Sequence, residues 1–436
     1  MKDRKVRVFS LVLAVPLFVA AFWIFSAEVG ATDDPAGKLF QALNWVSESP
    51  DRAWARVSLG DVYVSLGRHE DAIKAYKTAL RFEPDNAFAM NGMGYAWLGL
   101  GKPEKALQFF VDAAAADPSK ADLKSLGYTW MALGKNAEAL DTFNSVLAKE
   151  PENTEILNAM GQASYSMGDF AGAVKYFETA ISVDPLKGDY ASLGYSYSAL
   201  GMEDRAKESY SEGVRLRPRD QESLNALGFS LFSRGRLEEA REIFYESLDI
   251  DPDNVYVLNG LGYVYSAGKD HEKAIEFLEK AARADQSQAD YVTTGYEYAA
   301  LERHREAEAA FRRAISRDPS SAAEAWYGLG YTLIAMGSNV EAMDAFRRSY
   351  MLMPEPRTLN SLGYAYMVVR NYPNAIEAFN RALGIDPEDA QARFNLALAM
   401  LDLDRRAEAR KYYGELQKID EELAAELKSI MDEAWK

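Results

Sequence analysis

The chain has 436 residues, no cysteine, and a formal net charge of −17 from 66 acidic and 49 basic residues. A hydrophobic share of 48% is ample for a packed core and argues against disorder. The absence of cysteine excludes disulfides, thiolate nucleophiles, iron–sulfur clusters and cysteine-ligated zinc. Because nucleic acids attract clustered lysine and arginine, the acidic balance argues against a nucleic-acid partner and favours a basic or neutral one.

Residues 1–31 have the layout of a segment that directs export. The first part is basic, with Lys2, Arg4, Lys5 and Arg7. An almost continuous apolar run follows over residues 8–25, and small residues stand at Gly30 and Ala31. The run fits both a signal peptide cleaved after Ala31 and a signal anchor that stays in the inner membrane. In either case we expect the remainder to lie outside the cytoplasm, periplasmic or anchored, with membrane contact only through this segment.

From residue 51 to about residue 420 the chain repeats one unit. A glycine within Leu-Gly-Tyr, or a close variant, returns every 33 to 35 residues. These anchor glycines are Gly60, Gly94, Gly127, Gly161, Gly194, Gly228, Gly262, Gly295, Gly330 and Gly363, and Ala397 takes the place in an eleventh copy. A period of this length indicates stacked supersecondary units that share one continuous core.

Four further positions keep step with the anchor. Alanine stands twelve residues after it in every copy, and an aromatic residue four positions later in ten copies, with Leu278 as the exception. We expect glycine and alanine to let two helices approach closely, and the aromatic ring to fill the space between them. A proline ends most copies, and a second glycine seven residues after the anchor is typical of a left-handed helix cap. Lys269 and Glu302 replace this second glycine, which suggests a bend near residues 266–303.

This pattern resembles the tetratricopeptide repeat family, with eleven tandem copies over residues 51–420. The resemblance implies an all-α fold, a right-handed superhelical solenoid of helix–turn–helix repeats in which the first helices line a concave groove. Residues 32–50 are expected to form an N-terminal capping helix and residues 421–436 a charged C-terminal one, because the ends of a solenoid need a polar cover.

Residues three before and one after each anchor share a face of the first helix, roughly 130° from the core direction. The resemblance implies that this face is the concave surface. An aromatic residue follows the anchor at Tyr95, Tyr128, Tyr195, Phe229, Tyr263, Tyr296, Tyr331 and Tyr364. Asparagine precedes it by three at Asn91, Asn158, Asn225, Asn259 and Asn360.

Two interpretations of these columns stand side by side. Asparagine offers a donor and an acceptor to a peptide backbone or to sugar hydroxyls, and tyrosine offers a flat apolar face with a polar tip. Such a ladder would bind an extended peptide or a glycan. Alternatively, each tyrosine wedges between neighbouring first helices and shapes the superhelix. Both interpretations can hold at once.

Residues that would carry catalysis are missing from the sequence. The three histidines, His69, His271 and His304, stand nine residues after an anchor, in the turn between helices, where we expect solvated side chains and no metal site. Phosphate-binding loops and nucleophile–base arrangements are not recognisable. We therefore predict no catalytic residue, no metal, no cofactor and no enzymatic activity.

The sequence favours a scaffold or adaptor in the bacterial cell envelope, which binds other proteins or an extended peptide through the concave groove. One alternative is a periplasmic component of exopolysaccharide synthesis or export that contacts polysaccharide. Another is a self-assembling structural scaffold, for which a homo-oligomer is expected.

Overall fold

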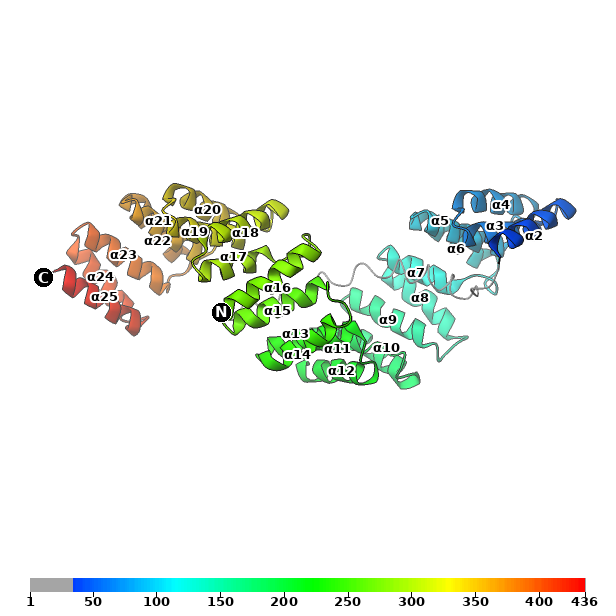
Figure 1. Cartoon of the computed structure of the whole chain (residues 1–436), viewed down its shortest axis with the longest axis horizontal. Coiled ribbons are helices and arrows are strands. Elements are labelled where there is room, and N and C mark those ends of the chain that lie inside the picture. Colours follow the sequence, from blue (N-terminus) through cyan, green and yellow to red (C-terminus); the bar gives the residue numbers. More distant parts are fainter. Residues whose placement is uncertain (1–33, 436) are drawn as a thin grey trace. The chain divides into compact units, whose positions relative to one another are not determined.

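The computed structural model describes residues 34–435, and these form 24 helices joined by short turns (Figure 1). The predicted export segment, residues 1–31, lies outside the described residues. Over residues 34–435 the helices are all too short or too polar to cross a bilayer.

Residues 34–227 form the first of two compact units. Its helices are α2 (Pro35–Glu48), α3 (Ala53–Ser65), α4 (His69–Phe82), α5 (Ala87–Gly99), α6 (Pro103–Ala116), α7 (Leu123–Ala132), α8 (Asn136–Leu147), α9 (Thr154–Ser166), α10 (Phe170–Val183), α11 (Tyr190–Ala199) and α12 (Glu203–Leu216). Helix α13 (Gln221–Ser233) begins in this unit and ends in the second.

Residues 228–435 form the second unit. Its further helices are α14 (Leu237–Leu248), α15 (Val255–Ala267), α16 (His271–Ala284), α17 (Tyr291–Ala300), α18 (His304–Arg317), α19 (Ala323–Ala335), α20 (Asn339–Leu352), α21 (Pro356–Val368), α22 (Tyr372–Ile385), α23 (Ala390–Asp402), α24 (Arg406–Leu416) and α25 (Glu421–Ala434).

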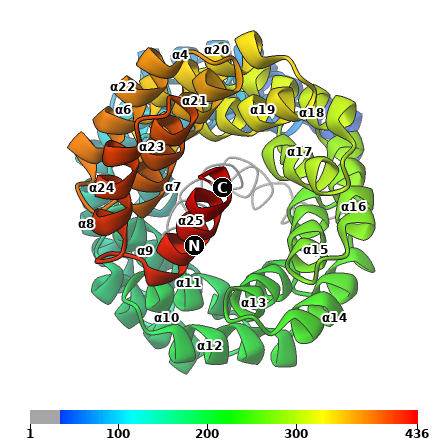
Figure 2. The same cartoon turned by 90° about the vertical axis from the view of Figure 1, so that its left-hand side faces the viewer.

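Within each unit the helices pack as consecutive hairpins. The pairs run from α3–α4 to α11–α12 and from α15–α16 to α23–α24. Successive first helices also touch, for example α7 with α9 and α19 with α21. In Figure 2, α15, α17, α19 and α21 line the inner side of the second unit, and α16, α18, α20 and α22 form its outer layer. The expected all-α solenoid of helix–turn–helix units is confirmed.

The anchor glycines lie where the aromatic ring of the second helix presses on the first. A Cβ atom added at Gly94 would meet the ring of Phe110 at 2.6 Å, and one added at Gly295 would meet Phe311 at 2.7 Å. These rings are fully buried. In the eleventh copy, where Ala397 already carries a methyl group, Tyr413 is only partly buried. The ring therefore explains why the anchor is glycine.

The turn inside each hairpin contains one residue in the left-handed conformation, seven residues after the anchor. Glycine occupies it in seven copies, with φ between 67° and 81°. Lys269, Glu302, Arg370 and Asp404 adopt the same conformation, with φ between 54° and 61°. The turns at Lys269 and Glu302 thus match the glycine turns, and the substitutions behind the predicted bend do not change the backbone there.

The first helices begin with a short polar side chain that caps them. Asn86, Asp122, Asn153, Asp189 and Asp290 each accept a hydrogen bond from the backbone N–H three residues later. Such a cap satisfies one of the free N–H groups at a helix start. It also fixes a carboxylate or amide at the beginning of these first helices, which is where the neighbouring repeat makes contact.

Single helices lie at both ends of the described chain. Helix α2 packs on α3, and its Ala42 is fully buried. Helix α25 packs on α23 and α24, and buries Leu427 and Met431 against the last hairpin. These two helices occupy the places predicted for the capping helices.

Candidate binding face on the first helices

The candidate site is one face of each first helix, which carries the residues six before, three before and one after the anchor. We refer to it as the first-helix face. It contains the thirteen predicted tyrosine, phenylalanine and asparagine residues. It belongs to the inner layer of helices within each unit (Figure 2).

Six of the eight aromatic residues after the anchor pack edge-to-face on the aromatic residue of the second helix in the same repeat. Their partners are given by the pairs Tyr95–Phe110, Tyr128–Phe143, Tyr195–Tyr210, Phe229–Phe244, Tyr296–Phe311 and Tyr331–Phe346, with ring centroids 5.0 to 5.5 Å apart. This geometry is a favoured one for aromatic pairs. One side of each of these rings is therefore covered by the second helix of its own repeat.

The hydroxyl groups of the same tyrosines reach the next repeat. Tyr95 donates to Asp122, the cap of α7, and the Tyr263 hydroxyl donates to Asp290 Oδ2, on the cap of α17, at 2.9 Å. Tyr128 and Tyr296 donate to Glu155 Oε1 and Glu324 Oε1, near the starts of α9 and α19, at 2.8 and 2.7 Å, and Tyr331 pairs with Ser361 Oγ at 2.8 Å.

Burial and the neighbouring carboxylates raise the pKa of Tyr95, Tyr128 and Tyr263, so these hydroxyls stay protonated and donate. Each is a fixed link between successive first helices.

The asparagines are used in a parallel way. The Nδ2 atoms of Asn91, Asn158 and Asn259 donate to the backbone carbonyls of Lys120, Lys187 and Gln288, at 2.9, 2.9 and 3.1 Å. These carbonyls lie in the loop before the next first helix. Asn360 Nδ2 donates to Asp389 Oδ2 at 2.8 Å, and Asn225 is partly buried on α13. Asn91, Asn259 and Asn360 are buried, whereas asparagines that served only to bind a ligand would be exposed.

The predicted columns thus serve first as joints between repeats, as the second interpretation expected. Their role toward a ligand stays a prediction, and one feature remains available to it, because Tyr331 and Tyr364 are half exposed. The Oδ1 atoms of Asn158, Asn259 and Asn360 accept no hydrogen bond within residues 34–435, but these atoms are buried.

A third column on the first-helix face was not anticipated. Six residues before the anchor stand Trp54, Phe88 and Tyr256, with exposed fractions of 48, 56 and 44%. These positions lie seven residues before the tyrosine column and therefore on the same side of the helix. The column could not be recognised from the sequence by residue type, because glutamate, arginine and glutamine occupy the same position in other copies.

The first-helix face of the first unit is acidic. Glu155 and Glu222 are exposed on it, and the caps Asp122 and Asp189 lie beside the tyrosine column. Partial desolvation, together with the charges of Asp189 and Asp220, raises the pKa of Glu222 to about 7. A carboxylate with this pKa is short of a counter-ion, since the nearby Arg217 only partly offsets the repulsion.

The second unit has a cluster of aromatic and charged residues on α19 and α21. Tyr327 packs edge-to-face on Tyr331, at 5.0 Å between ring centroids. The guanidinium of Arg357 lies 4.6 Å from the ring centroid of Tyr327, and its Nη2 is 2.7 Å from Glu324 Oε2. Because the charges of Arg357 and Glu324 are paired with each other, a ligand would contact mainly the tyrosine rings and hydroxyls of this cluster.

The expectation of solvated histidines is wrong, because His69 is buried and His271 and His304 are only partly exposed. His69, the first residue of α4, is buried, because its ring fills the space beside Gly99. His271 Nδ1 lies 2.7 Å from Glu297 Oε2, and Glu297 is buried and also accepts from Ser266. Within residues 34–435 no group of three or more His, Asp or Glu side chains is arranged to hold a metal ion.

Comparison with known proteins gives a consistent family match. Profiles described as tetratricopeptide repeats match residues 60–101, 97–163, 130–194, 190–220, 220–287, 292–355 and 360–423. No curated protein matches the chain.

Solved structures with a similar fold include an APC/C hetero-tetramer, Cut9–Hcn1, at 16% identity and a TM-score of 0.45, covering 96% of this chain and 93% of that chain. Another is YrrB, described as a TPR protein with an unusual peptide-binding site. It is 22% identical with a TM-score of 0.38, and the match covers 43% of this chain and 96% of that chain.

Proposed function

Since residues 60–423 of this chain belong to the tetratricopeptide repeat family, whose members generally mediate protein–protein interaction, we propose that the protein is a non-catalytic adaptor. It binds extended peptide segments of partner proteins along the first-helix face. The hairpins supply a rigid series of positions at a regular spacing, which suits an extended chain more than a compact ligand.

The observation that carries this proposal is the set of large aromatic side chains that the fold exposes on this face. Trp54, Phe88, Tyr256, Tyr331 and Tyr364 are each 44 to 56% exposed. Exposed aromatic residues that share one face mark interaction surfaces, because they gain contact area on binding at little cost in side-chain entropy.

The charge of the first unit indicates the chemistry of its peptide. Glu155 and Glu222 are exposed between the aromatic positions, and Asp189 and Asp220 add further negative charge near Glu222. A segment that alternates apolar and basic side chains complements this surface. Charge complementarity of this kind mainly sets the association rate and the choice of partner.

We place this activity in the bacterial cell envelope. The basic residues before residue 8 and the apolar run over residues 8–25 support export or anchoring. Residues 34–435, which hold the proposed binding face, then lie outside the cytoplasm. N-terminal sequencing of the protein recovered from cells, together with its partition between soluble and membrane fractions, tests this placement. Recovery from the cytoplasm with the first 31 residues intact would contradict it.

Site-specific photo-cross-linking in cells tests the binding face. The photoreactive amino acid benzoylphenylalanine replaces Phe88 in one variant and Lys77, exposed on the second helix α4, in a matched control. We expect a defined protein adduct from position 88 and none from position 77.

The other outcomes overturn the proposal in different ways. An adduct of the chain with itself would identify self-assembly. An adduct removed by glycosidases but not by proteases would identify the polysaccharide alternative. Equal adducts at both positions would show that the first-helix face has no special role.

A further inference from the structure

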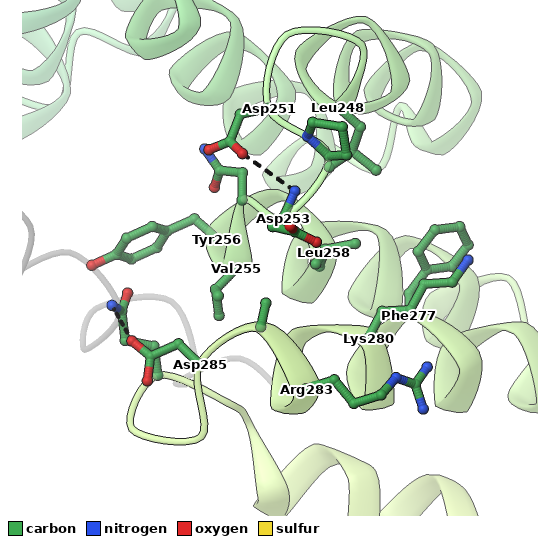
Figure 3. Close-up of a pocket in the computed structure, with 14 residues that line it drawn as sticks. Leu248, Asp251, Asp253, Val255, Tyr256, Leu258, Phe277, Lys280, Arg283 and Asp285 are labelled. Carbon is green, nitrogen blue, oxygen red and sulfur yellow. Dashed lines mark hydrogen bonds between the residues drawn. The ribbon is translucent and has the colours of Figure 1, made fainter.

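Two open hollows follow each other along the second unit, and only the first is lined by a residue of the first-helix face, Tyr256. The first has a volume of 890 Å³ and lies between the start of α15 and the end of α16 (Figure 3). Lys280 and Arg283 extend from α16 on one side of it, and Tyr256 lies at the other (Figure 3). Its lining also holds Asp251, Asp253 and Asp285, so acidic residues outnumber basic ones.

In the second hollow, basic residues outnumber acidic ones. It has a volume of 590 Å³ and lies between the C-terminal ends of α16 and α18, with Arg283 shared between the two. Arg283, Arg313 and Arg317 line it, against one carboxylate, Glu279. Glu279 is already engaged, because it accepts from the Tyr298 hydroxyl and lies 3.6 Å from Arg283.

Arg313 and Arg317 are held without a carboxylate partner. Neither forms an ion pair within residues 34–435. Their guanidinium carbons lie 5.9 and 5.6 Å from the ring centroid of Tyr291, which is buried at the start of α17. Arg317 Nη1 also donates to the backbone carbonyl of Ala289. The shared ring and this hydrogen bond restrict both side chains, which lowers the entropy lost when they bind a ligand.

The repeat architecture does not require these two arginines. The position of Arg317, twenty-two residues after the anchor, is apolar in nine of the other ten copies. The fifth copy has a tyrosine, Tyr190, at the place of Tyr291, but Glu212 and Leu216 stand where the eighth copy has Arg313 and Arg317. The fifth hairpin therefore forms without the arginine pair, although its Arg217 makes the hydrogen bond equivalent to that of Arg317, from Nη2 to the backbone carbonyl of Gly188 at 3.0 Å. The pair Arg313 and Arg317 occurs only in the eighth copy, and Arg283 of the seventh copy completes the cationic pocket in a chain whose net charge is −17.

We propose that the pocket formed by Arg283, Arg313, Arg317 and Tyr291 binds the carboxylates of an acidic peptide segment. Guanidinium groups match carboxylates in shape and can donate two parallel hydrogen bonds to each. Arg313 and Arg317 are the carboxylate donors, Tyr291 fixes their planes, and the hydroxyls of Ser287 and Ser316 line the same hollow. The pocket and the first-helix face then select segments of opposite charge, so the chain holds two different partners or two parts of one.

Fluorescence anisotropy with the full-length protein tests this assignment. The probe is a short labelled peptide with a run of glutamates between glycine–serine flanks, compared with its glutamine counterpart. We expect binding of the acidic probe only, weakened by added salt. Exchange of both arginines for glutamine (R313Q with R317Q) should weaken it at least about tenfold, because charge-assisted hydrogen bonds are lost.

The matched control is Arg348→Gln, which removes the same charge from the equivalent helix position in the ninth copy. Arg348 is paired with Asp344 and lies outside the pocket. Arg313→Gln alone is a second variant, since Arg313 donates no hydrogen bond to the backbone loop and its loss should leave the fold intact. Circular dichroism verifies folding of each variant.

Unchanged affinity in the R313Q variants, or an equal loss in Arg348→Gln, would overturn the proposal. So would the absence of binding to the acidic probe. Binding of a hexuronate oligomer or of inorganic phosphate, but not of the peptide, would overturn the assignment to a protein partner. Because Phe88 and the first-helix face are not involved, these outcomes are independent of the cross-linking test above.

Discussion

Replacing Gly295 by alanine puts a methyl group where the ring of Phe311 already lies. The added Cβ would be 2.7 Å from that ring, while alanine itself favours the helix over glycine by about 1 kcal/mol. Overpacking of a filled core costs about 1–3 kcal/mol, so after the helix preference of alanine is subtracted we expect a net loss of up to about 2 kcal/mol. Urea denaturation followed by circular dichroism measures it.

Ala397→Gly is the matched control for this substitution. The eleventh copy already accommodates a methyl group at the anchor, with Tyr413 less buried than its counterparts. We expect this change to cost only about 0.5–1 kcal/mol, through the conformational freedom of glycine. A gain in stability for Gly295→Ala, which the helix preference of alanine alone would give, would contradict the view that the ring determines the anchor.

The left-handed turn residues give a prediction of the opposite sign. Lys269 and Glu302 have φ of 61° and 57°, a conformation that costs a residue with a Cβ about 1–2 kcal/mol. Glycine relieves this strain but also increases the conformational entropy of the unfolded chain, which lowers the stability of the folded state by about 0.4–1 kcal/mol. We expect Lys269→Gly and Glu302→Gly each to raise the free energy of unfolding by about 0.5–1 kcal/mol.

Gly235→Ala and Gly337→Ala, in turns with φ of 74° and 78°, should lower the free energy of unfolding by a similar amount. Thermal denaturation of the four variants under one set of conditions makes the comparison. Destabilisation by both substitutions to glycine would show that the Lys269 and Glu302 side chains make contacts that outweigh the backbone strain.

Between elements, the tyrosine hydroxyls link one first helix to the next. Tyr95→Phe keeps the ring on Phe110 but removes the hydrogen bond from α5 to Asp122 at the start of α7. A hydrogen bond to a charged acceptor at a partly buried site contributes about 1–3 kcal/mol, so the midpoint of urea denaturation should fall accordingly.

Tyr364→Phe is the control, because Tyr364 is half exposed and its hydroxyl makes no hydrogen bond within residues 34–435. We expect its stability to stay within about 0.5 kcal/mol of the wild type. If Tyr95→Phe were as stable as Tyr364→Phe, the tyrosine column would not act as a joint between repeats.

The hairpins could be predicted from the sequence because their determinants are local. Gly295, Ala307 and Phe311 lie within seventeen residues of one another and recur in register, so periodicity alone reveals their contact. The joints between repeats could not be predicted in the same way. The acceptors of the tyrosine hydroxyls, Asp122 and Glu324 among them, lie 27 or more residues further on and change from copy to copy.

The candidate site was predictable only in part for the same reason. The asparagine column could be recognised because its residues share one face of the first helix. Whether Asn91 binds a ligand or the Lys120 carbonyl, however, depends on the loop of the next repeat. Trp54 and Phe88 escaped notice because their column has no shared chemistry. The burial of His69 depends on Gly99, thirty residues later, which leaves room for the imidazole ring.

At the scale of the whole molecule, the excess of acidic residues leads to a prediction about how stability depends on pH. In the first unit, partial desolvation and the charges of Asp189 and Asp220 raise the pKa of Glu222 from its ordinary 4.5 to about 7. The folded state therefore holds the proton of Glu222 more tightly than the unfolded state. By linkage, ionised Glu222 lowers stability above pH 7, and this penalty disappears as the pH falls from 7 to 4.5.

Glu222→Gln removes this titration without removing volume. We expect the variant to melt at a higher temperature than the wild type at pH 8, and at nearly the same temperature at pH 4.5. The difference should develop mainly between pH 4.5 and 7, and about half of it should be present midway between these two values. Glu155→Gln, an exposed carboxylate on α9 that accepts a hydrogen bond from Tyr128, should show no gain in stability at pH 8. A pH-independent difference between wild type and Glu222→Gln would mean that Glu222 ionises as an ordinary surface carboxylate. The first-helix face of the first unit would then lack the negative field that we expect to attract a basic peptide.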